Sequence, residues 1–160
     1  MCLNKINGIK GFKLIHQGKI RDIYQYDEGQ ILIITSDKIS AFDFVFDDEI
    51  VGKGNILTSI TKYWFRKTRE IIDNHFIDKE PKLKNEFINR AMLAKKADVV
   101  PFEAIVRGYL TGSAWQEYRK NKTIGGEKTT KDYNEYDELE SPCFTPTTKA
   151  KLGNKDQPIN

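Results

Sequence analysis

The fold of this chain is decided by the stretch KIRDIYQYDEGQILIITS, residues 19–36. It contains two short runs rich in Ile, Tyr and Leu, Lys19–Tyr26 and Ile31–Ser36, separated by the segment DEGQ. Gly29 in that segment can adopt a positive φ, so the pattern predicts a β-hairpin. Similar short runs on either side predict further strands at Gly11–His16 and Phe42–Phe46.

Apolar side chains then recur at helical spacing. The pattern predicts one helix that starts near Asn55 and continues to Phe76 through Leu57, Ile60, Trp64, Thr68 and Ile71. Asn55 or Thr58 can cap its first turn. We expect Trp64 and Phe65 to anchor the core rather than to stack on a ligand.

The rest of the chain mixes both kinds of element. Glu86–Ala94 and Pro101–Leu110 are predicted strands, Ser113–Lys120 a short helix, and Asn121–Leu139 a loop. Pro101 favours an extended conformation for the residue before it, which predicts a hinge in the segment between the two strands. Strands first and mixed elements later favour an α+β fold, with a β-rich lobe over residues 1–97 and a second α+β lobe over residues 98–160.

Composition excludes several classes of protein. The chain has 160 residues, of which 39% are hydrophobic, and 26 basic against 23 acidic residues give a net charge of +3. This balance argues against intrinsic disorder, and the diffuse charge argues against a dedicated nucleic-acid binder. The longest stretch without a charged residue, Gly108–Gln116, is too short to span a membrane. No secretory signal opens the sequence, so we expect a cytoplasmic protein without a membrane partner.

Two segments in the first third carry candidate binding residues. Lys19 and Arg21 are two positions apart beside Gly18, so on one strand face they would suit a polyphosphate. The alternative is a solvated strand face. Asp37, Ser40 and Asp43 follow the most apolar strand and could bind a polar ligand or a metal-bound group. They could equally be turn formers.

Two later segments favour an anion. Arg107–Ser113 ends a predicted strand and opens a predicted helix, where helix N–H groups and an arginine attract negative charge. The alternative is that Ser113 only caps the helix. Thr147, Thr148 and Lys149 combine hydroxyls with a cation, although the segment is also ordinary loop sequence. No cluster has metal-ligand spacing and no residue is marked as a nucleophile, so residue chemistry predicts phosphate sites without a reaction.

Four segments in this order resemble one family, the SAICAR synthetases of purine synthesis. The segments are Gly18–Tyr24, Thr35–Asp43, Val99–Glu103 with Val106–Trp115, and Phe144–Ala150, and the resemblance extends from about Leu14 to Ala150. It implies a ligase that uses ATP and Mg²⁺ to join CAIR, an aminoimidazole ribonucleotide, to L-aspartate. ATP would convert the carboxylate of CAIR into an acyl phosphate that the amine attacks, so no protein nucleophile is needed.

The resemblance also implies roles for individual residues. Lys19 and Arg21 would cover the ATP phosphates. The backbone of Asp98, Val99 and Val100 would run beside the adenine and offer it hydrogen-bonding groups. Lys149 and Asp37 would be the catalytic residues. The implied substrate-binding residues are Ser40, Asp43, Arg107, Thr111, Ser113, Thr147, Thr148 and Asp156. The implied fold has a β-rich N-terminal lobe, similar to the ATP-binding lobe of kinases, and part of a second lobe.

The sequence departs from the family toward its C-terminal end. Of the family's His-Asp-Glu-Asn segment only Asp156 matches, and Glu127–Glu140 lacks the family's Pro-x-Gly-Leu pattern. The later family segments that hold magnesium do not occur. We therefore expect a homo-oligomer or a complementary C-terminal polypeptide. The alternative function is a non-catalytic nucleotide-binding subunit.

Overall fold

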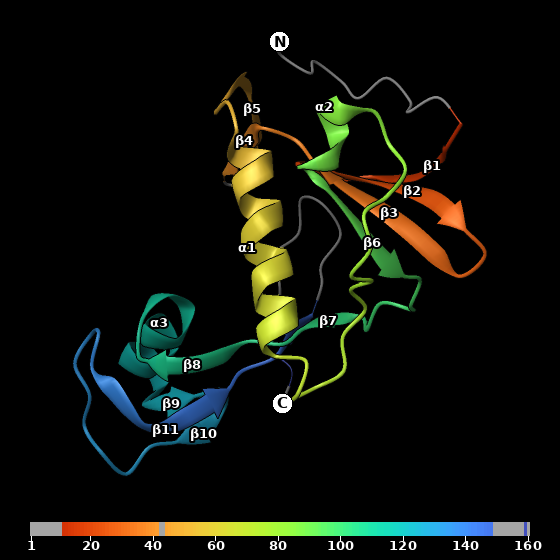
Figure 1. Ribbon diagram of the computed structural model, residues 1–160. Helices are drawn as coiled ribbons and strands as arrows, with labels where there is room; N and C mark the ends of the chain where they lie inside the picture. Colours follow the sequence, from red (N-terminus) through yellow and green to blue (C-terminus); the bar gives the residue numbers. More distant parts are fainter. Residues whose placement is uncertain (1–10, 42–43, 149–158, 160) are drawn as a thin grey trace. The chain divides into compact units, whose positions relative to one another are not determined.

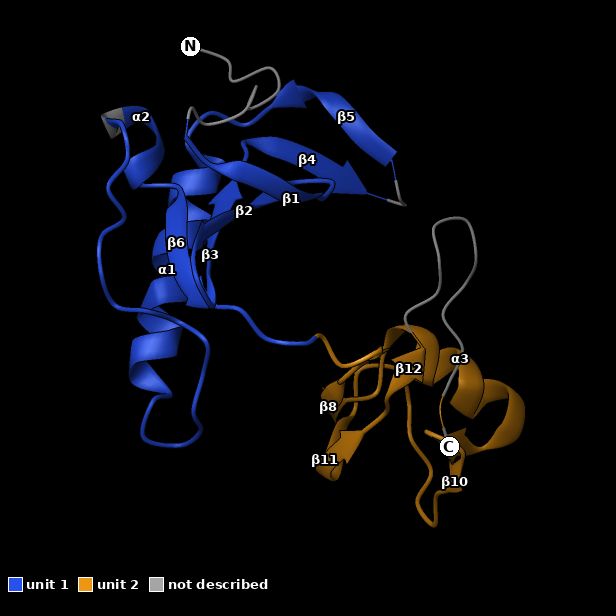
Figure 2. Cartoon of the chain, turned by 90° about the vertical axis from the view of Figure 1, so that its right-hand side faces the viewer, with its two compact units in different colours: residues 1–98 blue, residues 99–160 orange. Residues whose placement is uncertain are grey.

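The computed structural model describes residues 11–41, 44–148 and 159. The chain divides into two compact units, residues 1–98 and 99–160, coloured separately in Figure 2. The division falls within the segment between the strands predicted at Glu86–Ala94 and Pro101–Leu110, one residue after the expected lobe boundary.

Unit 1 is built on an antiparallel sheet in the order β1-β2-β3-β6 (Figure 1). Its strands are β1 (Lys13–Gln17), β2 (Arg21–Asp27), β3 (Gln30–Thr35) and β6 (Ala91–Lys95). The predicted hairpin is confirmed as β2 and β3. A separate pair consists of β4 (Lys38–Ala41) and β5 (Phe44–Glu49), so the strand predicted at Phe42–Phe46 is shifted toward the C-terminus. Helices α1 (Lys53–Lys67) and α2 (Asn85–Ile88) complete the unit.

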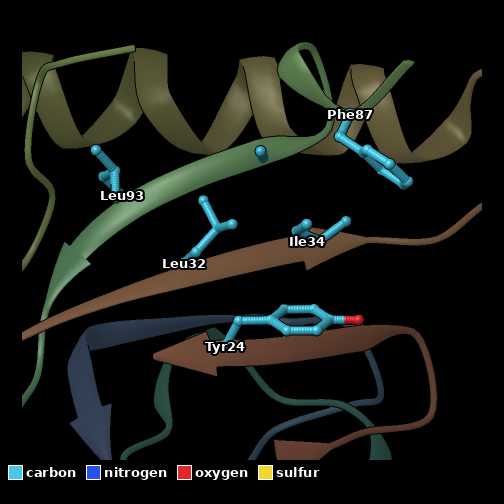
Figure 3. Close-up of a cluster of buried hydrophobic side chains, with 6 residues drawn as sticks. Tyr24, Leu32, Ile34, Phe87 and Leu93 are labelled. Carbon is cyan, nitrogen blue, oxygen red and sulfur yellow. The ribbon is translucent and has the colours of Figure 1, made fainter. Parts of the chain in front are cut away.

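The core of unit 1 lies on one face of the sheet. Tyr24, Leu32, Ile34 and Leu93 project from β2, β3 and β6, and Phe87 of α2 packs against them (Figure 3). Because side chains alternate along a strand, Ile33, Thr35 and Met92 belong to the opposite face. Helix α1 contacts β3 and β6 on that side (Figure 1).

Helix α1 is shorter than its apolar spacing predicts. It ends at Lys67, where the Thr68 amide donates to the Trp64 carbonyl at 2.9 Å, and Gly52 rather than Asn55 or Thr58 is the N-cap. Ile71 is 82% exposed beyond the helix. Phe76 is buried through a β-bridge to Ala94 and stacks on Phe65.

Two further predictions for unit 1 are wrong. Trp64 is 58% exposed and does not anchor the core, because it faces away from the sheet that Thr58 and Phe65 approach. The strand predicted at Glu86–Ala94 starts only at Ala91. Its first half forms α2 instead, which turns Phe87 into the core.

The described residues of unit 2 form one helix and three antiparallel strand pairs. The helix α3 (Gly112–Asn121) extends the predicted helix by one residue at each end. The pairs join β8 (Val106–Tyr109) to β11 (Glu138–Phe144), β7 (Phe102–Glu103) to β12 (Thr147–Thr148), and β9 (Thr123–Ile124) to β10 (Glu127–Lys128). The strand predicted at Pro101–Leu110 is thus divided into β7 and β8. The core consists of Leu110, Ala114, Tyr118, Ile124 and Leu139.

The two units together confirm the predicted α+β class, since the described strands pair antiparallel and the helices pack beside them. Among the described residues, no helix is both long and apolar enough to cross a membrane.

Candidate functional site

The start of helix α3 gathers the first group of candidate residues. The Arg107 guanidinium in β8 donates from Nη2 to Ser113 Oγ and from Nε to Thr145 Oγ1, both at 2.9 Å. The antiparallel register explains this arrangement, because Cys143 pairs with Arg107 and Thr145 follows two positions later on the same face as Cys143. Thr111 is the N-cap and Ser113 lies inside the helix, so the alternative that Ser113 only caps the helix is wrong.

These side chains line a cavity of about 300 Å³. The cavity brings together three predicted substrate-binding residues, Arg107, Ser113 and Thr147, whereas Thr111 does not line it. The remaining lining residues are Glu103, Ile105, Ala114, Glu117, Gly125, Thr145, Pro146 and Ile159. Thr148 lies in the adjoining strand β12.

The part of this cavity beside Arg107 and the start of α3 suits an anion. The first turn of α3 has no acidic residue, so its N–H groups and the positive end of the helix dipole are not offset locally. Arg107 adds a cation whose planar guanidinium matches phosphate or carboxylate oxygens. The cavity can therefore hold a phosphate group against Arg107, Ser113 and the first turn of α3.

Sequence reasoning did not assign a role to Thr145 or Glu117. Thr145 lies within the quoted Phe144–Ala150 segment, but its bond to Arg107 spans 38 positions and depends on the β8–β11 register. Glu117 follows Ser113 by one helical turn. This spacing in the sequence could have predicted that both side chains share one face of α3.

Asp37 occupies a different position from the one its predicted catalytic role suggests. Its carboxylate is 8% exposed, accepts the Gly54 amide at 2.8 Å and the Gly52 amide at 3.3 Å, and pairs with Arg90 Nη2 at 3.0 Å. Burial alone would raise the pKa of Asp37, but the hydrogen bonds from Gly54, Arg90 and Gly52 outweigh it and lower the pKa. Asp37 is therefore an ionised group that fixes the start of α1 to the end of β3.

Of the residues expected to accompany Asp37, the structure describes Ser40, which lies in a strand. Ser40 is half-buried in β4, opposite Val45 of β5. Asp43 lies outside the described residues, as do Lys149 and Asp156.

Lys19 and Arg21, the candidate residues for the ATP phosphates, lie between β1 and β2 and at the start of β2. Lys19 lies in the turn between β1 and β2, where the Gly18 amide donates to the Arg21 carbonyl at 2.8 Å, so the predicted common strand face of Lys19 and Arg21 is wrong. Gly18 approaches the Arg21 backbone closely, since a Cβ there would lie 2.7 Å from the Arg21 oxygen.

Arg21 lines a cavity of about 220 Å³ between the sheet and α1. Its other lining residues are Ile33, Thr35, Thr58, Thr61, Phe65, His75 and Met92. Burial lowers the pKa of the His75 imidazole, so Arg21 is the charged group of this cavity near neutral pH.

The segment of Asp98, Val99 and Val100 has no regular structure, and all three residues are exposed. Its backbone amides and carbonyls take no part in the described strand ladders. Within the described part of the chain, no three His, Cys, Asp or Glu side chains group closely enough to hold a metal ion.

Comparison with known sequences gives one consistent family. The SAICAR synthetase family model matches residues 14–160. The phosphoribosylaminoimidazole-succinocarboxamide synthase of Halorhodospira halophila is 40% identical over 158 residues, which cover 95% of this chain and 54% of the relative. The synthase of Geobacter metallireducens is 44% identical over 156 residues, which cover 92% and 52%. The chain thus spans about half the length of the curated relatives it matches.

Solved structures agree with the sequence matches. A SAICAR synthase from Saccharomyces cerevisiae, described as complexed with SAICAR, aligns with a TM-score of 0.81 at 35% identity, covering 92% of this chain and 54% of that one. A type-2 SAICAR synthetase in complex with ADP aligns with a TM-score of 0.69 at 22% identity, covering 91% and 54%. These likenesses confirm the predicted SAICAR synthase-like fold.

Proposed function

Because this chain belongs to the SAICAR synthetase family, we propose that it supplies binding sites for the ATP-dependent ligation of CAIR with L-aspartate. The products of this reaction are SAICAR, ADP and phosphate, and the reaction belongs to cytoplasmic purine synthesis. The observation that carries the proposal is the cavity at the start of α3, where Arg107, Ser113 and Thr147 converge.

The phosphate of CAIR is the part of the substrate that this cavity suits. Arg107 is already oriented by Ser113 and Thr145, so little side-chain entropy is lost when an anion binds. The yeast relative is described as complexed with SAICAR, a molecule that bears the same ribose phosphate. In the proposal, Thr111, Thr147 and Thr148 add hydroxyl groups around the substrate, and Ser40, Asp43 and Asp156 stay proposed substrate-binding residues.

The phosphates of ATP are proposed to bind to unit 1, where Arg21 and Lys19 would face them. The exposed backbone of residues 98–100 stays a proposed source of hydrogen bonds to the adenine. The cavity beside Arg21 is consistent with such a ligand, because it combines a cation with threonine hydroxyls. ATP supplies the phosphoryl group that activates the carboxylate of CAIR.

Magnesium fits the described residues less well. They hold no acidic cluster of the kind that binds Mg²⁺ beside a nucleotide, so no step is assigned to the metal on this chain. Lys149 stays a proposed catalytic residue, which would offset charge that develops on the substrate. Asp37 is proposed to act by holding α1 in place rather than by touching substrate.

Calorimetry with SAICAR and with its dephosphorylated nucleoside tests the proposal. A charged hydrogen bond to phosphate contributes about 1.5–3 kcal/mol, so Arg107→Ala should weaken SAICAR binding roughly ten- to a hundredfold and leave nucleoside binding nearly unchanged. Arg119→Ala is a matched control, because Arg119 is an exposed arginine in the last turn of the same helix. Equal losses for both ligands would rule out the phosphate role of Arg107.

A second candidate is a non-catalytic nucleotide-binding subunit that needs a second polypeptide. One side of α1 exposes the large apolar residues Ile56, Ile60, Tyr63 and Trp64, and the relatives are nearly twice as long as this chain. Exposed apolar surface of this kind favours association. SAICAR formation by the purified 160-residue chain alone would exclude this candidate, whereas formation only after adding the other half of a relative would support it.

A further inference from the structure

Glu117 holds a turn that forms one wall of the cavity at the start of α3. Its Oε1 accepts hydrogen bonds from Thr123 Oγ1 at 2.7 Å and from the Gly126 amide at 2.9 Å. Its Oε2 accepts the Gly125 amide at 3.2 Å. The carboxylate therefore ties the β9–β10 hairpin to the middle of α3.

The turn that Glu117 holds packs closely against the Thr145 side chain. Gly125 and Gly126 have φ values of 60° and 82°, which side-chain-bearing residues rarely adopt. A Cβ on Gly125 would lie 3.1 Å from the Thr145 Cγ2 methyl group, so the turn backbone is in close contact with that side chain. Thr145 is buried, and its Oγ1 accepts the Arg107 Nε hydrogen bond.

We propose that Glu117 is a positioning residue for the anion-binding arginine of this cavity. The contacts run in one series: the Glu117 carboxylate fixes the Gly125–Gly126 turn, the turn fixes Thr145, and Thr145 fixes Arg107. The inference rests on the proposed binding of a phosphorylated substrate by Arg107.

The charge of Glu117 is compatible with an anion site because it is already hydrogen-bonded. A bare carboxylate lining the cavity would repel a phosphate, but here three donors direct their N–H and O–H dipoles at its oxygens. Glutamine has nearly the same shape, yet its amide nitrogen cannot accept a hydrogen bond. Glu117→Gln should therefore release one side of the turn without changing the volume of the wall.

The test measures SAICAR affinity for the wild type, Glu117→Gln, Arg107→Ala and the double variant. The dephosphorylated nucleoside is the second ligand. Glu127→Gln is the matched control, because Glu127 is an exposed glutamate on the same hairpin that does not line this cavity. Thermal unfolding of each variant is recorded alongside the affinities.

We expect Glu117→Gln to weaken SAICAR binding about tenfold, to leave nucleoside binding within about twofold, and to add no further loss when Arg107 is already alanine. A purely structural role would weaken both ligands alike or give additive losses in the double variant, and either result overturns the inference. So does unchanged SAICAR affinity in Glu117→Gln. If Arg107→Ala itself leaves SAICAR binding intact, the proposed function fails, and this outcome is distinct from failure of the Glu117 inference alone.

A second readout is independent of ligand. The backbone amide hydrogens of Gly125 and Gly126 should exchange with solvent faster in Glu117→Gln than in the wild type. Equal exchange rates in the two proteins would contradict the hydrogen bonds on which the inference depends.

Discussion

Replacing Asp37 should destabilise unit 1 more than any other single change to an acidic residue for which the structure shows contacts. Asp37→Ala removes an ion pair in which both side chains are 10% exposed and leaves the Arg90 guanidinium buried without its carboxylate. Breaking one partner of such a pair costs about 3–5 kcal/mol. The loss of the Gly52 and Gly54 contacts is included in that range, because the same carboxylate makes them.

Two further variants provide destabilisations with which that of Asp37→Ala can be compared. Asp37→Asn keeps an oxygen for the Gly54 amide but loses the charge facing Arg90, so a smaller loss of about 1–3 kcal/mol is expected. Asp48→Ala is the control, since Asp48 is exposed in β5 and should change the free energy of unfolding by no more than about 0.5 kcal/mol. The expected order of destabilisation is Asp37→Ala, then Asp37→Asn, then Asp48→Ala.

Urea unfolding followed by tryptophan fluorescence measures the order. A Trp115→Phe background leaves Trp64 of α1 as the probe, so the signal reports on unit 1. A midpoint for Asp37→Ala that matches the Asp48→Ala midpoint would refute the assignment of Asp37 as the group that fixes α1. Full stability of Asp37→Asn together with lost ligation would instead favour direct contact with the reacting groups.

Because the pKa of Asp37 is lowered in the folded state, its ionised carboxylate stabilises the fold above the unfolded-state pKa, and this stabilisation is lost as pH falls through the folded-state pKa. In urea melts below about pH 4, the wild type should therefore lose stability that Asp37→Asn does not lose. Gly18→Ala should cost roughly 1–3 kcal/mol by thermal melting because its Cβ meets the Arg21 oxygen, whereas Gly108→Ala, with open space around it, should be nearly neutral. Lys19→Met and Arg21→Met should weaken ATP binding about tenfold at unchanged melting temperature. Unchanged affinity in both variants would support the alternative that these two residues only form a solvated surface. Added Mg²⁺ should raise the ATP affinity of the isolated chain by less than about twofold in calorimetry, and a larger increase would show a metal site that the described residues do not reveal.

Local patterns were sufficient for the elements whose partners are close in sequence. The β2–β3 hairpin follows from two runs rich in Ile, Tyr and Leu and a glycine turn between them, and α3 follows from the Thr111-Gly112-Ser113 segment that opens it. The predicted end of α1 was wrong because Ile71 and Phe76 continue the helical spacing by coincidence. Phe76 is buried by pairing beside Ala94, a contact that no periodicity within residues 55–76 encodes.

The same limit applies to the candidate site. Arg107 and Ser113 could be found because a strand end, an arginine and a helix start occur within seven residues. Asp37 was selected from the sequence as a candidate catalytic residue, but the partners that occupy its carboxylate come from the start of α1 and from Arg90, 53 positions away. Distinguishing a carboxylate that binds substrate from one that binds its own backbone requires tertiary contacts.

The strand order of unit 1 affects how the chain can fold while it is being synthesised. Strand β3 pairs with β6 across a separation of about 60 residues, from Ile34 with Ala91 to Gln30 with Lys95, so β3 has one open edge until the later strand arrives. At ribosomal rates of about 5–20 residues per second, several seconds pass between the synthesis of the two strands. During that interval Leu32 and Ile34 face water on a nascent hairpin, and the nascent chain is then exposed to aggregation and to chaperones. Unit 2 also has long-range pairs, β8 with β11 and β7 with β12. Its β9–β10 hairpin closes within six residues, Thr123–Lys128, and can form as soon as it emerges.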